Sequence, residues 1–77
     1  MSYGYSLKLI ELNKAADKKL LGVYFGAVCI EHDVPVAEVA EKLNVSRQAV
    51  YNWFAGVSNP KAPVAVKIEK FIAKLER

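Results

Sequence analysis

Two short apolar patterns, separated by a single asparagine, occupy the middle of the chain between Val36 and Ala55. Each pattern repeats its apolar residues at the three- and four-residue spacing of an α-helix. Asn44 stands between them, and asparagine is one of the few residues besides glycine that readily adopts a left-handed backbone. We therefore predict two helices, over residues 36–43 and 46–55, that meet at a sharp turn. The apolar positions are Val36, Val39, Ala40 and Leu43 before the turn, and Val45, Ala49, Val50, Trp53 and Phe54 after it.

The residues around this turn are suited to starting and stopping helices. Ser46 is a good N-cap, because its hydroxyl can accept a hydrogen bond from an amide of the first turn. Gly56 follows the last apolar position and predicts the end of the second helix. Ala40 is small, so we expect the two helices to cross closely at this residue.

Four side chains of the second helix should point away from the core: Arg47, Gln48, Tyr51 and Asn52. Polar side chains on an exposed helix can reach base edges in the major groove of DNA. Gln48 can bind adenine through two hydrogen bonds, and Arg47 can bind guanine or grip a phosphate. Tyr51 would contact a thymine methyl group, and Asn52 would contact a base or the DNA backbone.

This stretch resembles the helix-turn-helix of the phage repressor and Cro-type family, also described as lambda-repressor-like. The resemblance covers roughly residues 34–75 and departs from the family pattern at two positions. Asn44 stands where the family usually has glycine, and Pro35 stands where its first helix usually starts with serine or threonine. The resemblance implies an all-α fold, a small helix-turn-helix domain of four to five helices with an extra N-terminal segment. The matching positions are Val39, Ala40, Leu43, Asn44, Val45, Ser46, Val50, Trp53, Gly56, Asn59 and Pro60.

By this resemblance we expect a sequence-specific double-stranded DNA-binding protein, a phage or bacterial transcription regulator in the cytoplasm and associated with the nucleoid. Such proteins usually bind as homodimers, so that two helices meet successive turns of the major groove. Ser46, Asn59 and Lys61 are the expected phosphate contacts, which fix the register on DNA.

The alternative is a protein-binding helix-turn-helix module, for example a phage modulator of host RNA polymerase, because a fold does not determine its function. Salt dependence separates the two hypotheses, since DNA binding weakens steeply as salt rises and an apolar protein contact does not.

Neither an enzyme nor a cofactor is expected, because the chain has one histidine, no paired carboxylates on a shared face and no glycine-rich phosphate loop. Glu31, His32 and Asp33 are consecutive, so on a helix they point in three directions and cannot share a metal ion. Cys29 is the single cysteine and is expected to be a small core residue. The longest apolar run, residues 20–30, is too short to span a membrane.

The net charge of +3 arises entirely in the C-terminal half of the chain. Residues 1–33 hold four lysines and four acidic residues, whereas residues 34–77 hold seven basic and four acidic residues. A basic half fits a phosphate-bearing partner, although an ordinary solvated surface can carry the same excess. We interpret the basic stripe of the last helix as such a solvated surface; it consists of Lys67, Lys70, Lys74 and Arg77.

Residues 1–16 form an N-terminal extension to the motif. Its first part, Met1–Tyr5, is expected to be loosely packed. Ser6 can cap a helix over residues 7–13, but an alternating pattern typical of an extended strand runs through the same residues, so both remain open.

A first long helix is expected over residues 17–33, with Asp17 as its N-cap. It is apolar nearly all round, so it should be buried on more than one side, by the N-terminal segment or by a second copy of the chain. Gly22 and Gly26 would let another backbone approach it closely.

A last helix is expected over residues 63–76, beginning with a proline in its first turn. The whole chain, 1–77, is interpreted as one domain.

Overall fold

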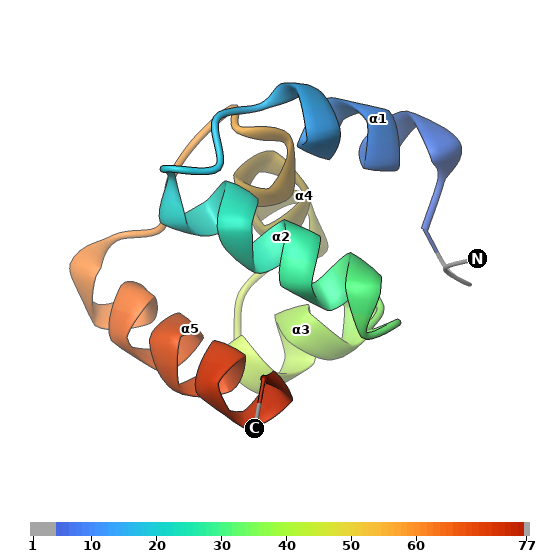
Figure 1. The fold of residues 1–77 in the computed structure, drawn as a ribbon. Coiled ribbons are helices and arrows are strands. Elements are labelled where there is room, and N and C mark those ends of the chain that lie inside the picture. The colour runs from blue at the N-terminus through green and yellow to red at the C-terminus, as the bar shows by residue number, and fades with distance from the viewer. Residues whose placement is uncertain (1–4, 77) are drawn as a thin grey trace.

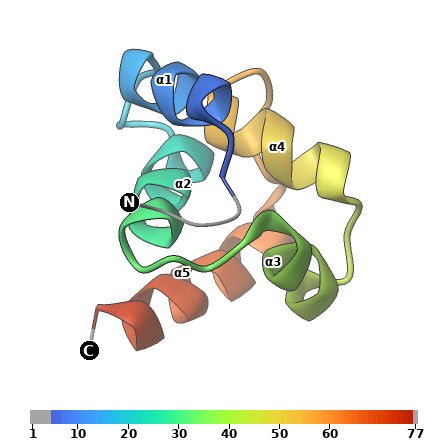
Figure 2. The same cartoon turned by 90° about the vertical axis from the view of Figure 1, so that its right-hand side faces the viewer.

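Five helices and no strand make up residues 5–76, the part of the chain that the computed structural model describes (Figure 1). The predicted all-α fold is confirmed. Figures 1 and 2 show α1 and α5 on opposite sides of the pair formed by α2 and α4. None of the helices in the described range is long and apolar enough to cross a bilayer. Their bounds are α1 Leu7–Ala15, α2 Leu21–Glu31, α3 Val36–Leu43, α4 Arg47–Ala55 and α5 Ala62–Leu75.

The N-terminal extension is helical where the sequence left helix and strand open. Ser6 is the N-cap of α1, and its hydroxyl accepts a hydrogen bond from the amide of Leu9 at 3.1 Å. The helix continues to Ala15, two residues beyond the predicted end. This segment packs against α2 and α4. Of the two partners expected for the apolar helix, the N-terminal segment is thus the one that the structure shows.

The predicted start of the long helix at Asp17 is wrong. Asp17 forms a local turn instead, in which its carboxylate accepts from the amide of Lys19 at 2.9 Å and its carbonyl from the amide of Leu20 at 3.1 Å. Aspartate often closes such turns, because its short side chain competes with the helix for backbone amides. The helix α2 therefore begins four residues later, at Leu21.

Three successive helices end in the same way, with one residue in the left-handed region. Asp33 and Asn44 have φ values of 56°, and Gly56 has a φ of 80°. In each case the amide of the residue after the left-handed one donates to a carbonyl five residues earlier, as in the bond from Val34 to Cys29 at 2.9 Å. Asn44 and Gly56 were predicted to end their helices, whereas the left-handed backbone of Asp33 was not predicted, and the helix expected over residues 17–33 ends at Glu31.

The helices α2 and α4 cross at Gly22 and Gly26. A Cβ atom built on Gly22 would lie 2.8 Å from Cβ of Trp53, and one on Gly26 would lie 2.8 Å from Cγ of Phe54. The two glycines thus allow a close backbone approach, as predicted, and the approaching backbone is that of α4 in the same chain. The same crossing buries Trp53 and Phe54 in the core.

An aromatic cluster connects the N-terminal segment to the core through Phe54, which is fully buried. The Tyr5 ring stacks on Phe54 with centroids 6.3 Å apart, and Phe25 meets Phe54 edge-on at 5.6 Å. The Tyr5 hydroxyl also donates a hydrogen bond to the Val34 carbonyl. Tyr5 is therefore a core residue, and the expectation that Met1–Tyr5 is loosely packed is wrong at this position, while residues 1–4 lie outside the described range.

One buried amide joins three helices. Asn13 of α1 is 2% exposed, and its Nδ2 donates to the carbonyl of Val23 in α2 at 3.0 Å and to that of Phe54 in α4 at 2.8 Å. The Phe54 carbonyl belongs to the last turn of α4, where carbonyls lack partners within the helix. Asn13 therefore stabilises the end of α4 from outside the helix-turn-helix.

We predict that Gly26→Ala destabilises the protein by about 2 kcal/mol, because the added Cβ would lie 2.6 Å from Nδ2 of Asn13 and 2.8 Å from Phe54. Thermal or urea unfolding followed by circular dichroism measures the change. Helix propensity alone predicts the opposite sign, a gain of about 1 kcal/mol. A variant as stable as the wild type, or more stable, would show that the helices do not approach as closely as described.

Candidate nucleic-acid interface

The helix-turn-helix is formed by α3 and α4, with Asn44 at the turn between them. The hydroxyl of Ser46 accepts a hydrogen bond from the Ala49 amide at 3.1 Å and so caps the start of α4. The inner face of α4 packs against α1, α2 and α3 through Val50, Trp53 and Phe54. Three neighbouring helices thus hold α4, and one face of it remains open to solvent.

Two amide side chains occupy the middle of this open face. Gln48 is exposed and Asn52 is partly exposed, and they lie one turn apart. Nε2 of Gln48 donates to Oδ1 of Asn52 at 2.9 Å. We call these two residues the amide pair. The bond leaves the Gln48 oxygen, one Gln48 N–H and both Asn52 N–H groups free to meet other polar groups.

The other two predicted base-contact residues lie at the border with α1. Arg47 is exposed and Tyr51 is partly buried. Together with Gln48 they line a shallow groove of about 300 Å³, whose opposite walls are Ser6 and Leu9 of α1 and Val36 of α3. Arg47 and Tyr51 therefore lie beside α1, and Gln48 lies between them and Asn52 (Figure 2 shows α1 next to α4).

The three predicted phosphate contacts lie at the two ends of α4. Ser46 directly precedes α4, whereas Asn59 lies in the loop after it and Lys61 is the N-cap of α5. Ser46 already accepts a hydrogen bond as the N-cap, and its hydroxyl proton remains available to a phosphate. Lys61 is exposed at the start of α5.

Asn59 has a structural role that the sequence analysis did not anticipate. Its Oδ1 accepts a hydrogen bond from the amide of Gly22 at 3.1 Å, in the first turn of α2. The residue at the N-cap of α2, Leu20, provides no side-chain bond, so Asn59 caps this helix from the loop between α4 and α5. The amide N–H groups of Asn59 are the part of the side chain that a phosphate can bind.

The position of α1 beside the candidate interface was not predicted. Nothing in the sequence indicated that Ser6 and Leu9 flank α4, because the spacing of the N-terminal apolar residues allowed two different helix faces. The signal that was present is Asn13, a polar residue four positions after Leu9. Its burial fixes which face of α1 meets α4.

The remaining candidate groups of the sequence analysis take no part in this surface. Cys29 is fully buried, and burial, with a smaller contribution from the charge of Glu38, raises the pKa of its thiol from 9.0 to about 12. The thiol is therefore protonated at neutral pH and poorly nucleophilic. Within residues 5–76, no three His, Cys, Asp or Glu side chains are grouped to hold a metal ion.

A family model described as Helix-turn-helix matches residues 28–74 of the chain. The match begins inside α2 and includes all of α3, the turn and α4, and most of α5. The helix α1 lies outside it. No curated protein and no solved structure matches the chain.

We predict that Asn59→Ala lowers the free energy of unfolding by about 1 kcal/mol, because it removes the acceptor for the Gly22 amide. The matched control is Asn59→Asp, which keeps an acceptor oxygen and adds a negative charge at a helix start, so its stability should stay within about 0.5 kcal/mol of the wild type. Urea unfolding measures both. Equal losses in the two variants would contradict the capping role.

We also predict that stability falls as the pH rises above about 9. An acidic group whose pKa is raised on folding keeps its proton in the native state, so between pH 9 and 12 the unfolded chain releases a proton that the native chain retains. The free energy of unfolding should drop by at most about 1.4 kcal/mol per pH unit for this one proton. Burial also raises the pKa of the Tyr5 phenol, which adds to the slope above pH 10.

The measurement is urea unfolding at several pH values for the wild type and for Cys29→Val, which replaces the thiol by an apolar side chain. The variant should have a shallower slope between pH 9 and 10. Identical slopes would show that Cys29 is not the group responsible.

Proposed function

The chain belongs to the Cro/C1-type, lambda-repressor-like helix-turn-helix family of DNA-binding regulators, and we propose that it is a sequence-specific transcription regulator of phage or bacterial origin that reads double-stranded DNA in the major groove with α4. The observation that carries the proposal is the amide pair on the open face of α4. It combines free donors and acceptors at the position from which this motif contacts bases.

The chemistry of the amide pair favours an A·T base pair. Adenine presents N7 as an acceptor and the N6 amino group as a donor in the major groove. Gln48 can accept from N6 through its free oxygen and donate to N7 through its free N–H, while its other N–H keeps the bond to Asn52. Asn52 thus positions Gln48, and its own N–H groups remain for the carbonyl oxygen of a neighbouring base.

The flanking residues supply contacts of other kinds in this proposal. Arg47 and Tyr51 lie beside α1, from which Arg47 binds a guanine or a phosphate and Tyr51 contacts a thymine methyl group. Ser46 grips one DNA strand at the start of α4, and Asn59 and Lys61 grip the other strand after its end.

Single domains of this size bind DNA weakly, so we propose that two copies bind successive turns of an operator in the cytoplasm. The basic excess of residues 34–77 supports the approach to DNA, since positive charge steers association with the phosphate backbone.

We predict that Gln48→Ala weakens binding to the operator by about 1–3 kcal/mol and reduces discrimination against a changed A·T pair. Asn52→Ala should have a smaller effect in the same direction, because it removes the group that positions Gln48. Lys61→Ala should weaken binding to all duplexes alike and reduce the salt dependence by about one phosphate contact.

Fluorescence anisotropy measures these affinities, with labelled duplexes from beside the protein's own gene and a scrambled duplex, at low and moderate salt. The control variant is Glu69→Gln, an exposed change on α5, which should behave like the wild type. Weak binding that is indifferent to sequence and unchanged by Gln48→Ala would refute base readout by α4.

A further inference from the structure

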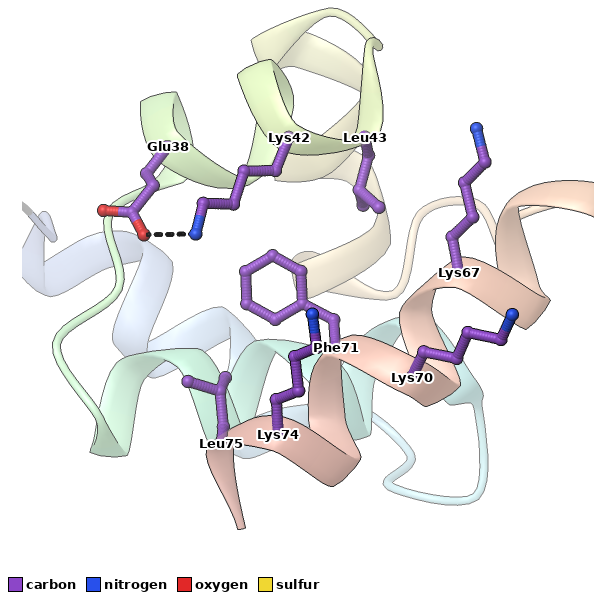
Figure 3. A pocket seen from close by; sticks show the side chains of 8 residues that line it. All are labelled: Glu38, Lys42, Leu43, Lys67, Lys70, Phe71, Lys74 and Leu75. Atoms are coloured by element: carbon purple, nitrogen blue, oxygen red, sulfur yellow. Dashed lines mark ion pairs between the residues drawn. The ribbon is translucent and has the colours of Figure 1, made fainter. Parts of the chain in front are cut away.

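A second surface feature lies on the other side of the molecule from α1, between α3 and α5. It is a groove of about 490 Å³ with an apolar floor made of Leu43, Phe71 and Leu75. Figure 3 shows the Phe71 ring at its centre, between side chains from the two helices. The described residues that line the groove come from α3 and α5 and none comes from α4, so the groove does not include the amide pair.

The rim of this groove is strongly positive. Four lysines line it, Lys42 from α3 and Lys67, Lys70 and Lys74 from α5, against a single acidic residue, Glu38. Glu38 pairs with Lys42 at 3.6 Å, which is the only ion pair within residues 5–76. The local charge of the groove is therefore +3, equal to that of the whole chain. The groove thus carries a local excess of positive charge, while Arg47 and Lys61 lie outside it.

The aromatic floor and the cationic rim are in contact. Nζ of Lys42 lies 5.7 Å from the centroid of the Phe71 ring, within the range of a cation–π interaction. Phe71 also packs edge-on against Phe25 of the core with centroids 5.4 Å apart, so its ring is held in place from below. The upper face of the ring is a fixed apolar platform under a positive rim.

The chemistry of this groove favours one kind of occupant. A second copy of the chain would bring the same four lysines to a symmetric contact, and like charges would oppose each other there. Nucleic-acid phosphates would satisfy the lysines but would leave the apolar floor without a partner. An amphipathic segment with acidic residues beside a large apolar side chain satisfies both features.

We propose that the groove between α3 and α5 docks an acidic amphipathic segment of a partner protein, with a large apolar side chain of that segment on Phe71 and its carboxylates among Lys67, Lys70 and Lys74. The inference does not rest on the proposed DNA reading, because it involves a different face of the molecule. A protein docked here leaves the open face of α4 free, so that one chain can bind DNA and a partner protein together.

The test uses the full chain labelled with ¹⁵N and titrated, at about 0.15 M salt, with a synthetic helical peptide of about 14 residues, or four turns, built from glutamate, leucine and phenylalanine. The control peptide has lysine in place of every glutamate. Binding of the acidic peptide should shift the amide signals around Leu43, Phe71 and Leu75 and leave those of Gln48 and Asn52 unchanged. The control peptide should produce no shifts.

The matched variants are the double charge reversal Lys70→Glu with Lys74→Glu, and Lys19→Glu with Lys14→Glu as a control of the same charge outside the groove. All four side chains are exposed, so both proteins should fold. The first double variant should bind the acidic peptide at least about tenfold more weakly, and the control double variant should bind it within about threefold of the wild type, since charges beyond the Debye length are screened.

Three outcomes overturn the proposal: no shifts in the groove with the acidic peptide, equal weakening in the two double variants, or shifts that appear with both peptides. DNA affinity of the same variants, measured by anisotropy, distinguishes a phosphate site. If Lys70→Glu with Lys74→Glu abolishes DNA binding while the peptide does not bind, the groove belongs to the DNA surface. A change of oligomeric state in that variant, seen by sedimentation, would assign the groove to a second copy.

Discussion

The close crossing of α2 and α4 determines where the other helices can lie. Because Gly22 and Gly26 have no side chain, the backbone of α4 approaches α2 to a distance that a single added Cβ atom would prevent. The approach buries Trp53 and Phe54 in the core, where Phe54 is in contact with side chains from other helices. Tyr5 and Asn13 then contact Phe54 from the N-terminal side, and Phe25 links Phe54 to Phe71 of α5. The position of α4 is thus determined by the contacts of its inner face, and Gln48 and Asn52 on its outer face take no part in these contacts.

The additional helix α1 changes what a helix-turn-helix of this size presents to its surroundings. It lies outside the segment that matches the family, yet it provides the hydrogen bond to the last turn of α4 and one wall of the groove beside Arg47 and Tyr51. A small core is marginal in stability, and the extension adds Tyr5 and Leu9 to it. The extension therefore stabilises the helix-turn-helix. It also covers part of α4 on the side of Arg47 and Tyr51.

The helix-turn-helix itself was predictable from the sequence, because each of its features is local. Helical spacing, the left-handed Asn44, the capping Ser46 and the terminal Gly56 all act within a few residues of the chain.

The predictions were wrong where the local structure depends on residues that are distant in the sequence. The Asp17 carboxylate can cap a helix or close a turn, and it closes a turn, while the cap of α2 comes from Asn59, 37 residues from Gly22 in the sequence. The roles of Tyr5 and Asn13 likewise depend on contacts with Phe54, which no periodicity within residues 1–16 can indicate. The candidate residues on α4 could be named from the sequence, but the bond between Gln48 and Asn52 and the groove beside α1 required the fold.

The contacts that hold α4 in place have a consequence for which substitutions this protein can tolerate during evolution. Its ends are secured by the Ser46 hydroxyl, the Gly56 backbone and the Asn13 amide, and its inner face by Val50, Trp53 and Phe54. Gln48 takes part in none of these contacts, and its one hydrogen bond goes to Asn52 on the same face. Substitutions at these two positions therefore cost little folding free energy, typically within about 0.5 kcal/mol for exposed sites. If Gln48 and Asn52 read the bases as proposed, one or two such replacements would change the DNA sequence that is bound while the scaffold stays the same.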